Sequence, residues 1–220
     1  MQKRGLKIGT YDTAAELWLL AALELTVPET VTNYVDVPGR RKGPLDLSAT
    51  LTDGDPVYST RTLTATFESS EGSRTEREGR IECMMNHLHG QRVNIVLPDD
   101  PQRFLVGRVQ LEREYNTPAH ASVRLTAVCE PWRYSAAETV VTMQAEATQK
   151  SGILHNRGRL SVVPDLKITG GDVLITVGTT SETFGAGQYT RPWLWLPPGG
   201  LALKYSGAGT LTFTYREAVL

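Results

Sequence analysis

Cysteine and long apolar runs are both scarce in this chain of 220 residues, which contains only two cysteines. Cys129 falls on the apolar stripe of an expected strand, and Cys83 lies beside the apolar stripe of an expected helix. Such positions favour buried, reduced thiols over a disulfide or a metal site. No stretch is apolar over enough residues to form a signal peptide or a membrane span, so we expect no membrane association and synthesis in a host cytoplasm.

An excess of charge of either sign is also missing. The chain has 23 Lys and Arg residues against 24 Asp and Glu residues, a formal net charge of -1. A nearly neutral chain has no overall basic field that would recruit nucleic acid or anionic lipid. Any contact with nucleic acid therefore needs a local cause.

Motifs that carry catalysis or bind cofactors are absent: there is no nucleophile elbow, phosphate loop, H-E-x-x-H or paired C-x-x-C. His87 and His89 stand two residues apart on an expected helix, so they point to different faces and suit the charge of a helix C-terminus better than a metal. Asp99 and Asp100 lie between prolines on an expected exposed turn, where nothing separates their pKa values. The sequence therefore predicts no enzyme, no metal and no cofactor.

The most distinctive stretch is NYVDVPGRRKGPLD, residues 33–46. A short apolar segment is stopped at Pro38, crosses the cations Arg40, Arg41 and Lys42, and turns again before a second extended segment that includes Asp46. This order predicts two extended segments joined by a basic loop of limited flexibility. Such a loop suits docking onto another protein, and it equally suits a solvated hairpin loop.

The first 135 residues predict several strands and one helix. RTLTATFE, residues 61–68, alternates apolar residues with threonine, as a half-buried strand does. The helix is expected from a capping box at Ser73 and Glu76, through apolar residues from Ile81 to Leu88, to Gly90. Residues 13–16 suggest a helical turn before a strand toward residue 25, and further strands are expected at 6–8, 92–97, 104–113 and 121–129.

Beyond residue 152 the composition shifts toward glycine and threonine, and we expect a second domain. Residues 135–152 suggest a connector in which VVTMQAEA could form a strand. Gly170 and Gly171 between two apolar segments predict a hairpin turn, and glycine-rich stretches at 197–200 and 206–209 predict breaks between later strands. Short strands at this spacing indicate a sandwich or jelly roll, so we expect domains 1–135 and 136–220.

The segment PWLWLPP places Trp193 and Trp195 on one face of an expected strand and two leucines on the other. If the leucines pack inward, the tryptophans form a stacking platform for sugar rings or a flat protein contact; otherwise they belong to the core. With Tyr189 and Arg191, they are the candidate glycan-contact or protein-contact residues.

Considered together, the motifs resemble the distal tail proteins of long, flexible-tailed phages (siphophages) and prophages. The matching segments are 33–39, 45–47, 60–63, NHLHG at 86–90, 99–101, 107–108 and PWRY at 131–134. The second half looks like that family's galectin-like sandwich at 156–158, 207–210 and 215–218. Departures are one extra residue in the loop at 39–43 and Leu105-Val106 where an aromatic residue commonly precedes Gly-Arg.

The resemblance implies a mainly β fold: a tail-tube-like β-sandwich with one α-helix, followed by a galectin-like or jelly-roll β-sandwich. It implies a structural virion protein at the tail tip, a hexameric ring that joins the tail tube protein to the hub and to receptor-binding proteins, with DNA passing through its lumen. A lectin-like adhesin acting through the second sandwich is the alternative, and an envelope hydrolase using Asp99 or Asp100 is a third hypothesis. The candidate protein-interface residues are Pro38, Arg40, Arg41, Lys42, Asp46, Arg61, His89, Asp99 and Asp100.

Overall fold

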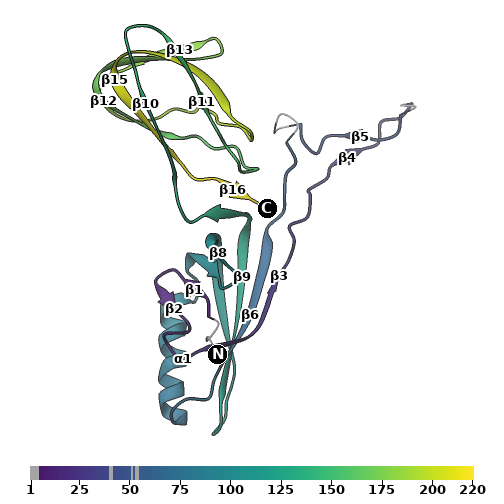
Figure 1. Cartoon of the computed structure of the whole chain (residues 1–220). Coiled ribbons are helices and arrows are strands. Elements are labelled where there is room, and N and C mark those ends of the chain that lie inside the picture. Colours follow the sequence, from purple (N-terminus) through teal and green to yellow (C-terminus); the bar gives the residue numbers. More distant parts are fainter. Residues whose placement is uncertain (1–4, 40–41, 51, 53–54) are drawn as a thin grey trace. The chain divides into compact units, whose positions relative to one another are not determined.

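The computed structural model describes residues 5–39, 42–50, 52 and 55–220, and the chain divides into two compact units, Met1–Pro131 and Trp132–Leu220. Strands dominate both units, and the described residues contain a single α-helix (Figure 1). The expected mainly β fold with one helix is therefore confirmed. The expected domain boundary at residue 135 lies in the same strand as the division, β9 (Ala121–Ser135).

Unit 1 is built on one sheet with the order β2-β1-β7-β8-β9-β6-β3. Side chains at alternate positions of its central strands, such as Leu63, Phe67 and Leu125, are fully buried, as their sequence period predicted. The expected strands are all present, although β8 and β9 extend beyond their expected ends. Their bounds are β1 Lys7–Ile8, β2 Tyr11–Asp12, β3 Leu19–Leu25, β6 Arg61–Ser69, β7 Arg92–Leu97 and β8 Asp100–Asn116.

The helix α1 (Arg74–Leu88) covers the buried face of this sheet with Ile81, Met84 and Leu88. Its capping box is formed as predicted: Ser73 Oγ accepts from the Glu76 amide at 3.3 Å, and Glu76 Oε2 accepts from the Ser73 amide at 2.6 Å. The helix is not apolar enough over a sufficient length to span a membrane, and no other helix occurs among the described residues.

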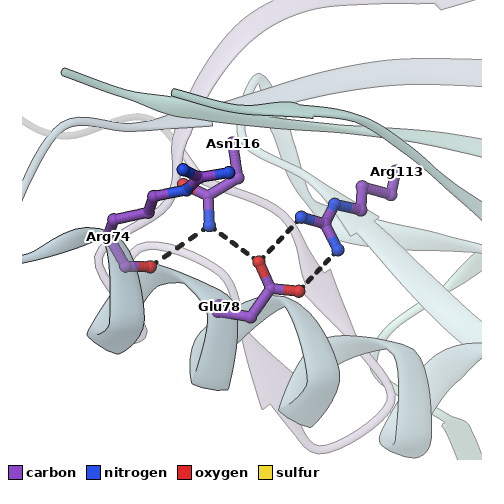
Figure 2. A network of polar contacts seen from close by, with 4 residues as sticks. All are labelled: Arg74, Glu78, Arg113 and Asn116. Atoms are coloured by element: carbon purple, nitrogen blue, oxygen red, sulfur yellow. Dashed lines mark hydrogen bonds and ion pairs between the residues drawn. The ribbon is translucent and has the colours of Figure 1, made fainter. Parts of the chain in front are cut away.

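A polar network joins the first two turns of α1 to β8 (Figure 2). The Arg113 guanidinium donates to both oxygens of Glu78, at 2.5 and 2.8 Å. Asn116 Nδ2 donates to Glu78 Oε2 at 2.8 Å and to the Arg74 carbonyl at 3.1 Å. Since the Arg113 side chain is 45 % exposed, the ion pair itself adds little stability, while the buried Asn116 amide links the start of the helix to β8.

Unit 2 is a sandwich made by one sheet folding on itself. The long strands β12 (Asp165–Val177) and β15 (Leu201–Tyr215) run side by side through both halves. β10 (Thr139–Gln144) and β14 (Gly187–Thr190) flank one half, whereas β11 (Lys150–Leu154) and β13 (Thr180–Phe184) flank the other. Buried side chains from both halves form one core, and β16 (Ala218–Val219) pairs with the end of β9.

The predicted hairpin at Gly170-Gly171 is wrong, because β12 continues through both glycines. The register against β15 shifts between Gly170 and Val173, so β12 carries one extra residue, a β-bulge. A Cβ atom on Gly207 would lie 2.1 Å from the Asp172 carbonyl oxygen. Residues 206–209 are thus the inside of a bend in β15, where two backbones approach closely, and do not separate two strands.

Two further predictions about unit 2 are corrected by the structure. Residues 135–152 are more than a connector: the strand expected in VVTMQAEA is present as β10, and β10 and β11 each pair with β15. PWLWLPP is not a strand: Leu196 makes only an isolated bridge with Val162, and the flanking prolines cannot donate to a ladder. Leu194 and Leu196 are nevertheless fully buried, which is the alternative in which the leucines pack inward.

Candidate functional site

An extended hairpin, which we call the arm (residues 26–60), connects β3 to β6. Its two sides are held by backbone hydrogen bonds, from the Ser59 amide to the Glu29 carbonyl and from the Val31 amide to the Val57 carbonyl, both at 2.8 Å. Farther out, β4 (Tyr34–Val35) pairs antiparallel with β5 (Leu45–Asp46). Figure 1 shows this pair extending beyond the ends of β3 and β6. The predicted pair of extended segments is confirmed.

The basic loop predicted at the end of the arm is described only in part. Pro38 and Lys42 are exposed, while Arg40 and Arg41 lie outside the described residues. Asp46 caps the chain that returns from the loop, accepting from the Ser48 amide at 2.9 Å. The Ser48 hydroxyl and then its amide hold the pKa of Asp46 below the usual range, because both hydrogen bonds favour the charged carboxylate.

Exposed apolar side chains are concentrated on the arm. Of the thirteen large hydrophobic residues that are exposed among the described residues, seven lie here, and Val27 (85 %) and Tyr34 (60 %) are exposed most. No hydrophobic residue of the described arm is among the buried core residues. A hairpin that adds nothing to its own core and presents this much apolar surface is suited to pack against another surface. The seven are Val27, Val31, Tyr34, Val35, Val37, Leu45 and Val57.

The strand that leads into the arm is an open edge of the sheet. Strand β3 pairs with β6 on one side, and within the described chain no strand pairs with its other side. Its sequence LLAALEL contains one charged residue, Glu24, and Leu19 is 42 % exposed. Natural edge strands that stay free usually carry charges or proline, so this edge is suited to pairing with another chain.

A second cluster of candidate residues surrounds Glu182 in unit 2. Arg191 donates from Nε to Glu182 Oε1 at 2.9 Å and from a terminal nitrogen at 2.8 Å. Trp193 Nε1 donates to Glu182 Oε2 at 3.0 Å. The guanidinium also stands over the rings of Phe184 and Tyr189, at 5.7 and 5.4 Å from their centroids. The Arg191 hydrogen bond, reinforced by that of Trp193, lowers the pKa of Glu182.

The structure therefore brings together three of the four predicted contact residues in this region, Tyr189, Arg191 and Trp193, but it engages them with one another and with their neighbours. Trp193 stacks on Phe184 and is half-buried. Trp195 is 55 % exposed and is the one tryptophan among these that offers its ring to a ligand. Glu182, which organises the cluster, was missed from the sequence, because an isolated acid in the strand TSETF gives no local signal.

Two of the expected interface residues act within the chain. Arg61 is 4 % exposed and donates to the Pro131 carbonyl, so it is not a surface residue. His89 is exposed, and its Nδ1 accepts a hydrogen bond from the Leu111 amide at 3.1 Å. Neither residue lies on the arm.

Asp99 lies in the turn between β7 and β8, as predicted, and Asp100 is the first residue of β8. Asp99 is exposed, and Asp100 pairs with Arg103 at 3.3 Å. Among the described residues, no group of three or more His, Cys, Asp or Glu side chains is arranged to hold a metal ion. The turn thus presents charge at the surface without an arrangement suited to metal binding.

No protein-family model and no curated protein matches this chain. A solved structure does match: SPP1 Dit (gp 19.1), described as a paradigm of the hub adsorption apparatus in phages that infect Gram-positive bacteria. The alignment covers 96 % of this chain and 98 % of that protein, with a TM-score of 0.69 and 17 % sequence identity. The two proteins therefore share a fold over nearly their whole lengths.

Proposed function

We propose that this chain is a structural protein of a phage tail tip, in which six copies form a ring. The shared fold with SPP1 Dit over 96 % of the chain supports a role in a tail adsorption apparatus. In this proposal the ring joins the tail tube protein to the tail hub and to receptor-binding proteins, and the first unit is the tube-like domain. The second unit is then the galectin-like domain.

The exposed apolar surface of the arm is the observation that supports self-assembly most. Seven exposed hydrophobic residues on a hairpin whose described residues contribute nothing to the hydrophobic core need a partner surface. In a closed ring, every copy makes the same contacts with its two neighbours. The arm and the sheet edge, which are open in a single copy, are therefore covered in every copy of the ring. The open side of β3 beside the arm supports the same assembly.

The face of the unit 1 sheet opposite α1 is suited to line the channel of such a ring. Two of its cations are ion-paired, Arg92 with Glu130 and Arg124 with Glu114 at 2.8 Å, and the exposed Arg108 on the same face donates to the Gly90 carbonyl. A paired guanidinium attracts phosphate less than a free one, so the face is suited to let DNA slide past without holding it. The overall charge of -1 agrees with this use.

The test compares oligomeric mass between wild type and an arm variant, Val31→Ser with Tyr34→Ser and Val37→Ser. The control is Ile153→Ser with Leu174→Ser, which removes exposed apolar side chains from unit 2. Light scattering over a range of concentrations, followed by negative-stain imaging, should show hexamers with a central hole for wild type and control. The arm variant should be a folded monomer. A wild-type chain that stays monomeric at all concentrations, or an arm variant that still forms rings, contradicts the proposal.

A lectin-like adhesin is a second candidate function, favoured only by the exposed ring of Trp195. Trp193 is less available, since Phe184 covers it and Glu182 takes its indole N–H. Sugar binding would therefore depend on Trp195, and a glycan array probed with wild type and Trp195→Ala measures it. Equal signals from both proteins would exclude this use of the ring.

A further inference from the structure

The strand β10 is a second open edge, in unit 2, and the ring proposal makes no use of it. It is the terminal strand of its sheet, bonded to β15 along residues 139–144. Its sequence TVVTMQ contains no charge, proline or glycine and is rich in β-branched residues, and Val140 is 59 % exposed. Free edges are normally protected by charge, proline or a bulge, and none of these devices occurs within β10.

Another edge strand of the same unit, β13, is protected. The side chains of Arg191 and Trp193, from the segment after β14, reach back to Glu182 on β13. A charged residue in the edge strand and two side chains gathered around it hinder the approach of another strand there. The contrast makes β10 a more accessible edge than β13.

The hydrogen bonds between β10 and β15 show which backbone N–H and C=O groups of β10 point to β15 and which point to the open side. The Ala145 amide donates to the Gly209 carbonyl at 2.9 Å, which extends the register of β10 with β15. Residues at odd positions, Val141 and Met143 among them, therefore exchange hydrogen bonds with β15. Val140, Thr142 and Gln144 direct their N–H and C=O groups to the open side, where no strand of the described chain meets them.

The core is incomplete along the same edge. Val141 and Met143 point inward and pack against the unit 2 core, yet both are only half-buried. Their outer sides lack the neighbouring strand that covers residues such as Leu211 and Phe213 on β15, which are fully buried. A strand added at this edge would cover them with its own inward side chains, provided that these are apolar.

Charge at the two ends of β10 indicates which strand fits. Glu138 precedes it and Glu146 follows it, and their side chains are 53 % and 59 % exposed. Each is held by one cation of the same chain, Arg216 at 2.9 Å and Lys150 at 2.5 Å. Pairing two copies of β10 antiparallel around Thr142 would set Glu138 opposite Glu146, and like charges directly opposite are destabilising.

We propose that β10 is a docking site for an extended segment of another protein, which adds to the sheet as an antiparallel strand. The occupant has apolar residues at alternate positions, facing Val141 and Met143, and a lysine or arginine near each end, facing Glu138 and Glu146. Backbone hydrogen bonds to Val140, Thr142 and Gln144 provide the affinity, while the inward side chains and end charges select the partner.

The probe for this site is the synthetic peptide KVTVTVTVK, whose valines face inward and whose lysines meet Glu138 and Glu146 when its centre lies opposite Thr142. The matched control peptide is EVTVTVTVE. Amide hydrogen exchange of the full chain should slow at Val140, Thr142 and Gln144 when the first peptide is added. The control peptide should bind at least about tenfold more weakly, because two attractions become two repulsions.

Two protein variants separate the backbone contribution from side-chain effects. Thr142→Pro removes the central outward N–H and leaves the bonds to β15 in place, a position where an edge strand tolerates proline. Thr142→Val keeps that N–H. The proline variant should bind KVTVTVTVK at least about tenfold more weakly than the valine variant.

Three results would overturn the proposal. The first is unchanged exchange at the three outward amides at millimolar peptide, and the second is equal binding of the two peptides to wild type. The third is protection that rises with protein concentration in the absence of peptide, which would identify a second copy as the occupant. The first two measurements use wild-type protein, so they decide the matter even if Thr142→Pro fails to fold.

Discussion

Arg77 provides the sharpest test of how unit 1 is held together. Its side chain is 1 % exposed on α1, and its guanidinium donates to the carbonyls of Gly72 at 2.5 Å, Thr117 at 2.9 Å and Pro118 at 2.8 Å. These acceptors lie in the turn before the helix and in the turn between β8 and β9. One buried cation thus ties both turns to α1.

Arg77→Met keeps most of the apolar stem and removes every donor. A hydrogen bond from a charged group contributes about 1.5–3 kcal/mol, but carbonyls near the surface recover part of this by binding water. For three bonds we expect the free energy of unfolding of unit 1 to fall by about 2–4 kcal/mol. The control is Arg74→Met, on the same helix, where the side chain is exposed and the expected change is within about 0.5 kcal/mol.

The assay is hydrogen exchange of residues 74–88 at increasing urea, because this segment reports on unit 1 alone. With a urea dependence of about 2 kcal/mol/M, Arg77→Met should lower the midpoint by about 1–2 M. Arg74→Met should leave it nearly unchanged. If both variants unfold at the wild-type midpoint, the three carbonyl contacts contribute little and the reasoning is refuted.

Three other perturbations test unit 2 and the two thiols. Gly207→Ala should destabilise unit 2 by more than about 3 kcal/mol in thermal unfolding, since the added methyl group meets a backbone oxygen of β12 at a φ of +138°. The hydrogen bond from Arg191 lowers the pKa of Glu182 from 4.5, so its stabilisation is complete above pH 4.5 and is lost as the pH falls through the lower folded-state value. The melting temperature of Glu182→Gln should consequently depend less on pH below 4.5 than that of wild type. Burial raises the pKa of Cys129 to about 11, so mass spectrometry should show iodoacetamide modifying the half-buried Cys83 and sparing Cys129 until urea unfolds the chain.

Local signals predicted the elements that local interactions create. The capping box at Ser73 and Glu76 involves residues three apart, and the alternation of Leu63, Ala65 and Phe67 needs only the two-residue period of a strand. The outer part of the arm was predictable for the same reason, because the two turns within residues 33–46 are formed by residues adjacent in the chain. In each case the residues that decide the structure are neighbours in the chain.

Predictions failed where the partner is distant in the chain. Gly170-Gly171 has the composition of a hairpin turn, but its role is set by Gly207 and Gly209, nearly forty residues later. Arg61 is a candidate interface residue from the sequence, but its guanidinium is buried and donates to the Pro131 carbonyl, seventy residues later. A local pattern cannot reveal a contact made between segments that far apart.

The exposed apolar residues of this chain are better explained by assembly than by imperfect folding. Each unit has a core of fully buried side chains, and the positions that remain apolar and exposed concentrate on the arm and include Leu19 on β3 and Val140 on β10. Chance exposure would scatter single residues over all elements. Since an open edge invites uncontrolled association, such strands persist where a defined partner covers them. The arm with β3, and β10 independently, are therefore the surfaces through which we expect this protein to join a larger structure.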